Sequence, residues 1–346
     1  MEISSLATES VLLSLDHGSK VGEVRRLATS MAGRLGFDEQ DRGRVALVLT
    51  EAANNAVLHG GGGEIVLRAF HGPSPGIEAI IADRGRGMPD VGRALRDGYS
   101  TAGTPGSGLG AIVRLSNKFD IYSAADLGTV LLVQVCSRAV VPSSDSNPRL
   151  ENGAVCLPRA GETDCGDAWA IGRSGDRNVL IVADGLGHGP EAAKASRQAI
   201  TTFHSRLTLP PADLLGEIHT ALRSTRGAAV AVAALDPTTR EIRYAGVGNI
   251  AGTIATGDVT RSMVSHNGTV GHEVRKIQEF TYPWPQGALV IMHSDGLQTQ
   301  WRLDRYPGLA TRAPAVIAGL LYRDFSRGRD DVTVTAVREA SPNGKA

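Results

Sequence analysis

Apolar side chains recur at helical spacing near the start of the chain and then gather into short, strand-like runs. Residues 21–35 and 41–59 place apolar side chains three or four positions apart, which predicts two amphipathic helices. The later runs are rich in Val, Ile and Leu and are bounded by turn residues, which predicts strands. The predicted strands are residues 64–70, 77–83, 119–123 and 129–136, and a further helix is expected after a glycine-rich stretch, residues 98–110. This order predicts an α+β fold with helices on one face of a mostly antiparallel sheet.

The second half of the chain shows a different order of elements. Two strands are expected first, then two consecutive helices, then further strands with one helix among them. The predicted strands are residues 167–172, 179–184, 228–235, 241–245, 251–255, 288–294 and 332–337, and the predicted helices are residues 191–207, 212–223 and 314–325. Two prolines and three serines without apolar periodicity separate the halves and predict a linker. We therefore expect domains at residues 1–140 and 151–340, joined by a linker at residues 141–150.

Composition and charge exclude several classes of protein. The 346 residues carry 36 basic and 36 acidic side chains, so the formal net charge is zero. A neutral chain argues against nucleic-acid binding that works by neutralising phosphates. No apolar stretch approaches the roughly 18 residues of a membrane span, and the N-terminus lacks the features of a signal peptide. The three cysteines form no CxxC pair, which argues against a disulfide framework or a structural zinc site. We expect a cytoplasmic protein with no nucleic-acid or membrane partner.

Glycine is the compositional anomaly, with 42 residues, and several glycines lie beside residues that can bind a nucleotide. Glu51 and Asn55 are four positions apart and share one face of a predicted helix, where their oxygens could hold Mg²⁺ and accept a proton. Asp83 ends a predicted strand, where a carboxylate can accept a hydrogen bond from an exocyclic amine. Gly85 and Gly87 follow it and allow the backbone to approach a flat ring. Each segment alone is more typical of a solvated helix face or a turn.

The glycine-rich stretch 98–110 supplies a third segment. Backbone amides at a helix N-terminus bind anions, so Gly106, Gly108 and Gly110 can belong to a phosphate cradle. No Gly-Lys-Ser/Thr sequence follows, and the spacing does not match a dinucleotide fingerprint. Together and in this order, the three segments resemble the ATP-binding boxes of the GHKL (Bergerat) ATPases, and in particular the small anti-sigma-factor serine kinases of the RsbT, RsbW and SpoIIAB type.

This resemblance covers about residues 10–137 and implies a Bergerat α/β sandwich that binds ATP with Mg²⁺. It implies that Glu51 is the base for an attacking serine hydroxyl, that Asn55 chelates Mg²⁺ and that Asp83 reads adenine. The three glycines of residues 98–110 would belong to the ATP lid, and Gly85 and Gly87 to the adenine-binding turn. Kinases of this type are often dimeric, so a homodimer is one expectation.

Aspartates stand where predicted strands of the second half begin or end. They are Asp167, Asp184, Asp295 and the pair Asp330 and Asp331. Hard divalent ions prefer clustered oxygen ligands, and two such ions can clamp a phosphoryl group and activate water. A single Asp-Gly pair is a common turn. Several strand-end aspartates together favour a two-metal centre.

The segments around these aspartates include Asp-Gly-Leu-Gly-His-Gly at 184–189 and Ser-Asp-Gly-Leu at 294–297. They resemble the SpoIIE, RsbX and RsbU branch of the type 2C (PPM) serine/threonine phosphatases over about residues 150–338. The resemblance implies an α-β-β-α sandwich that binds two Mn²⁺ or Mg²⁺ ions, with Asp184 essential for catalysis. The implied metal ligands are Asp167, Asp184, the carbonyl of Gly185, Asp295 and Asp330. Whether Asp331 or Asp164 also contacts metal stays open.

Two further features are expected to have structural roles. His188, in the Asp-Gly-Leu-Gly-His-Gly turn, could donate to phosphate but is expected to stabilise the turn. Residues 246–249, Gly-Val-Gly-Asn, are expected to form a strand-to-strand turn.

The two resemblances predict a chain with opposed phosphoryl chemistries. The second domain would hydrolyse phosphoserine or phosphothreonine on a partner protein, such as a STAS-domain antagonist of an anti-sigma factor, in a partner-switching pathway. The first domain would be a serine kinase. Two alternatives remain: a first domain that senses nucleotide or docks a partner without kinase activity, and a partner-switching scaffold with no enzymatic activity.

Overall fold

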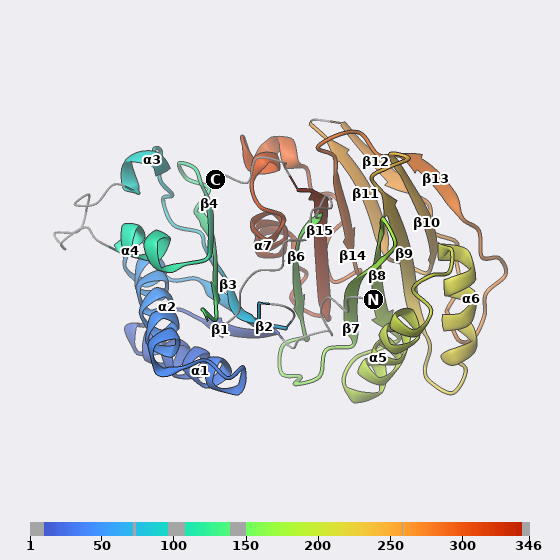
Figure 1. The fold of residues 1–346 in the computed structure, drawn as a ribbon, viewed down its shortest axis with the longest axis horizontal. Coiled ribbons are helices and arrows are strands. Elements are labelled where there is room, and N and C mark those ends of the chain that lie inside the picture. Colours follow the sequence, from blue (N-terminus) through green and yellow to red (C-terminus); the bar gives the residue numbers. More distant parts are fainter. Residues whose placement is uncertain (1–9, 72–73, 96–107, 139–149, 258, 341–346) are drawn as a thin grey trace. The chain divides into compact units, whose positions relative to one another are not determined.

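The computed structural model describes residues 10–71, 74–95, 108–138, 150–257 and 259–340. The chain divides into two compact units, an N-terminal unit within Thr8–Ser144 and a C-terminal unit that contains Asp145–Ala346 (Figure 1). Most of the glycine-rich stretch, including Gly106, and residues 141–149 of the expected linker lie outside the described residues. No helix in the described ranges is long and apolar enough to cross a membrane.

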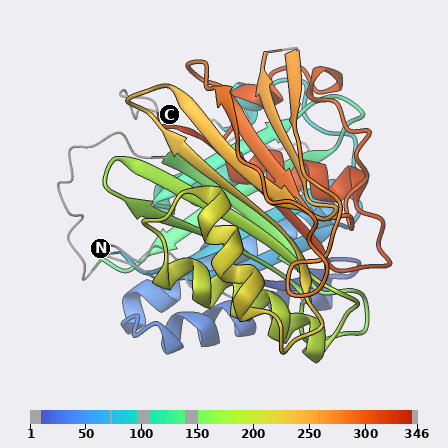
Figure 2. The same ribbon diagram turned by 90° about the vertical axis from the view of Figure 1, so that its right-hand side faces the viewer.

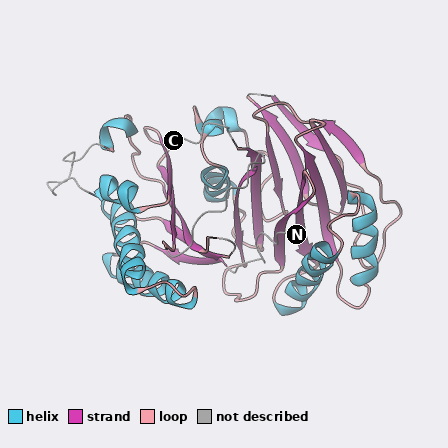
Figure 3. Ribbon diagram, viewed as in Figure 1, coloured by secondary structure: helices cyan, strands magenta, loops and turns pink. Residues whose placement is uncertain are grey.

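The N-terminal unit is a five-stranded antiparallel sheet with helices on one face, as the sequence predicted (Figure 3). The strand order is β1-β2-β3-β5-β4. The strands are β1 (Ser10–Ser14), β2 (Glu64–Phe70), β3 (Gly76–Asp83), β4 (Lys118–Ser123) and β5 (Thr129–Cys136). The helices are α1 (Gly18–Arg34), α2 (Glu39–His59), the short α3 (Val91–Ala94) and α4 (Gly108–Leu115). Apolar side chains of α1 and α2 form one core with those of β2, β3 and β5.

Helix α2 carries two of the candidate nucleotide-binding residues and has clear local reasons to form. Asp38 caps its start, because the Asp38 side chain accepts a hydrogen bond of 2.7 Å from the Asp41 backbone N–H. Val45, Leu49 and Ala52 lie on its buried side at helical spacing, facing the sheet. Burial of this apolar stripe fixes the rotation of the helix, and thereby the direction in which its polar residues point.

The C-terminal unit contains two five-stranded sheets that pack face to face. The first has the order β13-β10-β9-β8-β7 and the second has the order β12-β11-β14-β15-β6. The strands of the first sheet are β7 (Asp167–Ser174), β8 (Arg177–Gly185), β9 (Ala228–Asp236), β10 (Glu241–Val247) and β13 (Phe280–Pro283). Those of the second are β6 (Leu150–Leu157), β11 (Ala251–Thr256), β12 (Val259–Met263), β14 (Leu289–His293) and β15 (Val332–Glu339). A core that includes Trp169, Tyr244 and Trp284 fills the space between them.

Helices cover the outer faces of both sheets. Helices α5 (Pro190–Ser205) and α6 (Pro211–Ala221) pack on the first sheet through a second core, and they lie in front of its strands in Figure 2. Helix α7 (Pro314–Phe325) packs against β6 and β15 of the second sheet and buries ten of its twelve residues. Two short 3₁₀ helices, Leu303–Arg305 and Leu309–Thr311, precede it. The result is the α-β-β-α sandwich that the resemblance implied.

Besides the two 3₁₀ helices, five described elements were not predicted from the sequence: β1, α3, β6, β12 and β13. Strand β6 shows why. It contains Asn152 and Gly153, which disfavour strands, yet it pairs along its whole length with β15. Gly153 is required there because a Cβ would overlap the backbone of Ala315 at the start of α7. Strand β6 therefore forms because it pairs with β15 and packs against α7, although its local sequence does not favour a strand.

The close approach of β6 and α7 makes Gly153 a test of the packing. We expect Gly153→Leu to lower the free energy of unfolding of the C-terminal unit by about 3 kcal/mol, because neither backbone can move away. That loss corresponds to a fall in Tm of roughly 6–12 °C by calorimetry. Gly216→Ala in α6 is the control, since a Cβ there meets nothing within 4 Å, and Tm should stay level or rise. An unchanged Tm for Gly153→Leu would contradict the packing described.

Candidate functional sites

The strand-end aspartates of the C-terminal unit come together from both sheets. Asp167 begins β7 and lies directly opposite Asp184 of β8 in the antiparallel register. In the second sheet, Asp295 lies two residues beyond the end of β14, and Asp330 and Asp331 directly precede the neighbouring strand β15. Four segments that are far apart in the sequence therefore place carboxylates at neighbouring strand ends.

Ser294 connects these strand ends between the two sheets. Its hydroxyl donates a hydrogen bond of 2.6 Å to Asp167 Oδ2 on β7 of the first sheet. The Ser294 hydroxyl oxygen also accepts a hydrogen bond of 2.9 Å from the Thr333 backbone N–H on β15, and Ser294 N donates to Thr333 O. All the groups involved are buried, so the geometry is protected from competing water. Ser294 therefore holds Asp167 against the second sheet.

Asp331 is the buried member of the pair that precedes β15. Its side chain accepts a hydrogen bond of 2.8 Å from the Arg159 backbone N–H, and only 3% of the residue is exposed. Gly166 and Gly296 both pack directly against Asp331, and a Cβ at either position would overlap it. Two of the glycines beside the candidate ligands are thus needed for close approach. Asp330, by contrast, is exposed.

Crowding of these carboxylates disfavours their charged forms. Burial raises the pKa of Asp184 to about 9, and the negative charges of Asp167 and Asp295 add to the effect. Burial also raises the pKa of Asp167 well above its ordinary value, although the hydrogen bond from Ser294 acts in the opposite direction. A group of carboxylates that repel one another and are partly removed from water is stabilised by a bound cation.

Asn249 is a site residue that the sequence reasoning missed. Its side-chain Nδ2 donates a hydrogen bond of 2.7 Å to Asp295 Oδ2. Burial raises the pKa of Asp295, and Asn249 and the positive charge of Arg327 both oppose that rise. Asn249 was expected to belong only to a turn. It does follow β10 in the connection to β11, but no local signal could show that the turn ends beside Asp295, 46 residues away.

The donor set fits hard divalent cations. Carboxylate oxygens are the ligands that Mg²⁺ and Mn²⁺ prefer. Two buried oxygens here, Asp167 Oδ1 and Asp331 Oδ2, have no hydrogen-bond partner in the described part of the chain, and such orphaned acceptors are costly unless a cation or water completes them. Within the described ranges, no three acidic, His or Cys side chains already converge at ligand distances. Gly185 ends β8 next to Asp184, and its N–H donates to Gly166 O.

Residues around the aspartates hold the neighbouring loops. His188 Nδ1 lies 2.9 Å from Glu162 Oε1, and this contact joins the turn after β8 to the loop before β7. Asp164 forms an ion pair of 2.7 Å with Arg197 of α5.

His293 is a buried residue two positions before Asp295, and its Nε2 accepts a hydrogen bond from the Trp301 indole N–H. Burial lowers the pKa of His293, which favours the neutral form of the ring.

In the N-terminal unit, two of the predicted residues face the start of α4. A Cβ at Gly108 would lie 3.3 Å from Glu51 Oε2 and 3.6 Å from Asn55 Oδ1. Glu51 and Asn55 therefore converge on the helix that follows the glycine-rich stretch. Among the residues that the structure describes, the buried Nδ2 of Asn55 has no hydrogen-bond partner, which fits an amide that completes its bonds with a ligand. Gly110 is buried within the first turn of α4.

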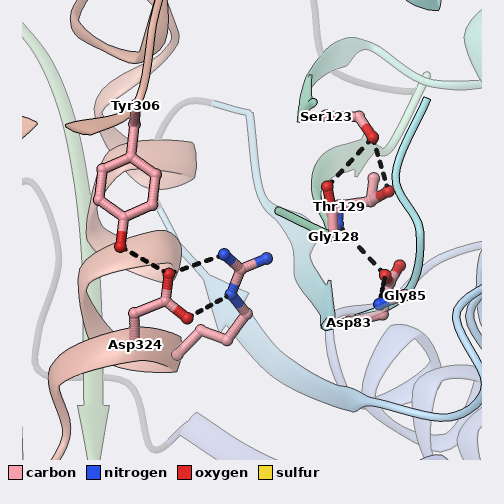
Figure 4. A network of polar contacts seen from close by, with 8 residues as sticks. Asp83, Gly85, Ser123, Gly128, Thr129, Tyr306 and Asp324 are labelled. Carbon is pink, nitrogen blue, oxygen red and sulfur yellow. Dashed lines mark hydrogen bonds and ion pairs between the residues drawn. The ribbon is translucent and has the colours of Figure 1, made fainter. Parts of the chain in front are cut away.

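Asp83 is held in a fixed orientation at the end of β3. Its Oδ1 accepts hydrogen bonds of 2.9 Å from Gly85 N and 3.2 Å from Thr129 N (Figure 4). The Thr129 hydroxyl also contacts Ser123, which binds the carbonyl of Gly128. Gly87 has a positive φ of 64° and packs against the carbonyl of Ala124, where no side chain fits.

Known families match both units of the chain. Residues 15–135 match the histidine kinase-like ATPase domain family, and residues 174–339 match the stage II sporulation protein E (SpoIIE) family. The chain is similar to the serine/threonine-protein kinase RsbT of Bacillus subtilis, with 35% identity over 30% of this chain and 80% of the relative. It is also similar to the phosphoserine phosphatase RsbX of the same organism, with 21% identity over 44% of this chain and 77% of the relative.

Two solved structures support the fold. One comes from work on the bacterial stressosome as a modular system that controls secondary messenger signalling. It is 31% identical, with a TM-score of 0.52, and covers 55% of this chain and 100% of that chain. The other is RsbX in complex with magnesium, 20% identical, with a TM-score of 0.50 and coverage of 57% and 98%.

The fold and the sites define a protein with an ATPase domain of the GHKL type and a phosphatase domain of the PPM type. The chain belongs to the RsbT-like family of histidine kinase-like ATPase domains, here joined to a SpoIIE-type phosphatase domain. The resemblance of the two domains to these families, which the sequence analysis identified, is confirmed. The roles of the individual site residues stay predictions.

Carboxylate crowding predicts opposite effects of one substitution with and without cations. In EDTA, we expect Asp184→Asn to raise Tm by roughly 2–4 °C, because it removes a charge that the folded state disfavours. With Mn²⁺ at about 100 times its Kd, wild-type protein should gain about 2.7 kcal/mol of stability, and Asp184→Asn should gain little. Differential scanning calorimetry measures both.

The pH dependence in EDTA follows from the same raised pKa. Between about pH 4 and pH 9 the folded state binds more protons at Asp184 than the unfolded state does, so stability should fall as pH rises. Asp184→Asn should weaken this slope. Glu273→Gln, which changes an exposed carboxylate, is the control and should leave both the slope and the Mn²⁺ effect intact. A Mn²⁺ effect that survives Asp184→Asn would remove Asp184 from the ligand set.

Proposed function

We propose that the C-terminal unit is a metal-dependent phosphatase that hydrolyses phosphoserine or phosphothreonine on a partner protein. The observation that carries the proposal is the gathering of strand-end aspartates from both sheets, with Asp167 of the first sheet hydrogen-bonded to Ser294 at the end of β14 in the second. Similarity to the phosphoserine phosphatase RsbX supports the same substrate class. A STAS-domain antagonist of an anti-sigma factor, in a cytoplasmic partner-switching pathway, is the substrate we propose.

Each residue at this site has a proposed task. Asp167, Asp184, the Gly185 carbonyl, Asp295 and Asp330 would hold two Mn²⁺ or Mg²⁺ ions. Such ions, when bound, neutralise phosphoryl oxygens and lower the pKa of water, which supplies the nucleophile for hydrolysis. Ser294 and Asn249 orient Asp167 and Asp295 through short hydrogen bonds, so that these carboxylates keep their direction. Asp331, held by the Arg159 backbone N–H, maintains the spacing of the strand ends and presents its orphaned Oδ2 to the same cations.

We propose that the N-terminal unit, within residues 1–140, binds ATP with Mg²⁺ and acts as a serine kinase. The convergence of Glu51, Asn55 and Gly108 supports this second function. Asn55 would chelate Mg²⁺, Glu51 would accept the proton of the attacking serine, and Asp83 would receive the adenine amine. Phosphoryl transfer depends mainly on positioning and charge neutralisation, so a site with few side chains is sufficient. A homodimer formed through this unit is part of the same proposal.

The phosphatase proposal predicts loss of activity from one conservative change. We expect Asp184→Asn to reduce Mn²⁺-dependent hydrolysis of p-nitrophenyl phosphate and of a phosphoserine protein by more than about 100-fold, because a metal ligand is lost. The measurement is phosphate release by purified full-length protein. Glu273→Gln serves as the matched control and should keep wild-type rates. Activity unchanged in Asp184→Asn would refute the assignment.

The kinase proposal predicts that one substitution removes phosphate transfer and leaves nucleotide binding intact. We expect Glu51→Ala to slow phosphate transfer from ATP to a STAS-domain protein at least about 100-fold, because the proton acceptor is lost, while ATP binding remains. The measurements are transfer of labelled phosphate and calorimetric titration with ATP·Mg²⁺. Glu39→Ala, at the exposed start of α2, is the control. Transfer by neither wild type nor Glu51→Ala, with ATP still bound, would instead favour a nucleotide-sensing or docking module.

A further inference from the structure

A polar hollow of about 490 Å³ opens on the C-terminal unit, beyond the residues assigned to the metal site. Its lining is Gln298, Thr299, Gln300, Ser326, Arg327 and Arg329. Every one of these side chains can donate a hydrogen bond, two carry a positive charge, and none is a carboxylate. A surface of this kind complements an anion.

Backbone hydrogen bonds hold this hollow directly beside the candidate metal ligands. The segment after Asp295 and the segment before Asp330 run next to each other. Gln298 N donates to Phe325 O at 2.9 Å, and Arg327 N donates to Gly296 O at 2.8 Å. One wall of the hollow therefore continues from Asp295 and the other leads into Asp330. A protein substrate bound at the aspartates can therefore extend along these two segments into the hollow.

The guanidinium groups of the two arginines are not held by any direct contact from the described residues, and the positive charge of Arg327 acts on Asp295 only at longer range. Along the part of the chain that the structure describes, the Arg327 and Arg329 side chains form no ion pair or hydrogen bond, and both residues are exposed. Other arginines near the site are engaged, as Arg197 is with Asp164. Two unpaired guanidinium groups on one short segment are suited to carboxylates, which they can bind through paired N–H groups.

We infer that this hollow is a specificity subsite for an acidic segment of the phosphoprotein substrate, next to the phosphoserine that is hydrolysed. The inference rests on the proposed phosphatase function and adds a sequence preference to it. Asp or Glu side chains flanking the phosphoserine would be bound by Arg327 and Arg329, while Gln298 and Gln300 donate further hydrogen bonds. The subsite positions the substrate and takes no part in breaking the phosphate ester.

Two phosphoserine peptides that differ only in their flanking residues test the subsite. One carries Asp and Glu on both sides of the phosphoserine, and the other carries Asn and Gln. Full-length protein in EDTA, which prevents turnover, should bind the acidic peptide at least about fivefold more tightly by fluorescence anisotropy, since two exposed ion pairs are gained. The preference should shrink as salt increases. With Mn²⁺, kcat/KM should show the same preference.

Substitutions at the two arginines decide the inference. The double variant Arg327→Gln, Arg329→Gln should reduce the preference to within about twofold, and Arg327→Lys, Arg329→Lys should retain part of it, because Lys keeps the charge but loses the paired geometry. Arg206→Gln with Arg275→Gln, exposed arginines elsewhere in the unit, should leave it intact. Equal binding of both peptides by wild type, or a preference that survives the double Gln variant, overturns the subsite. Hydrolysis of neither peptide would contradict the phosphatase function, and the binding data would still decide the subsite.

Discussion

The hydrogen bond from Ser294 to Asp167 is the interaction on which the phosphatase site depends. It joins the end of β14 in one sheet to the start of β7 in the other, and the Thr333 backbone holds the same hydroxyl. Without it, the carboxylates that repel one another would have reason to separate. Burial protects the bond from water, and the packed core between the sheets sets the distance that it spans. The same hydrogen bond therefore contributes both to the packing of the two sheets and to the geometry of the site.

The site concentrates negative charge although the chain as a whole is neutral. Raised pKa values at Asp184 and Asp167 show that the folded protein keeps an arrangement that is unfavourable without cations. An unfavourable local electrostatic free energy of this kind is typical of functional sites. The reaction requires the arrangement of charged groups, and the stability of the surrounding structure maintains it. Positive charge at the proposed substrate subsite comes from only two arginines. A chain without net charge can therefore still offer a local site for an acidic segment.

Much of the fold could be predicted because strong periodicity decides helices and strands locally. Strands β2 and β5 and helix α7 have the predicted bounds, and the α+β and α-β-β-α architectures are confirmed. Strands β12 and β13 were missed because edge strands are short, and β12 is mostly exposed, so they carry little apolar pattern. Strand β6 was missed because Asn152 and Gly153 conceal it. Its pairing with β15 depends on a partner about 180 residues away.

The residue types that the chemistry requires can be identified from the sequence. Aspartates beside glycines at strand ends, and Glu51 one helical turn from Asn55, were visible because local structure dictates their spacing. The residues that hold these side chains in place become visible in the folded protein. Asn249 lies beside Asp295, Arg159 beside Asp331 and Ser294 beside Asp167, and each pair comes from separate segments. Asn, Ser and backbone N–H groups are common in every turn, so their role depends on where packing of the sheets places them.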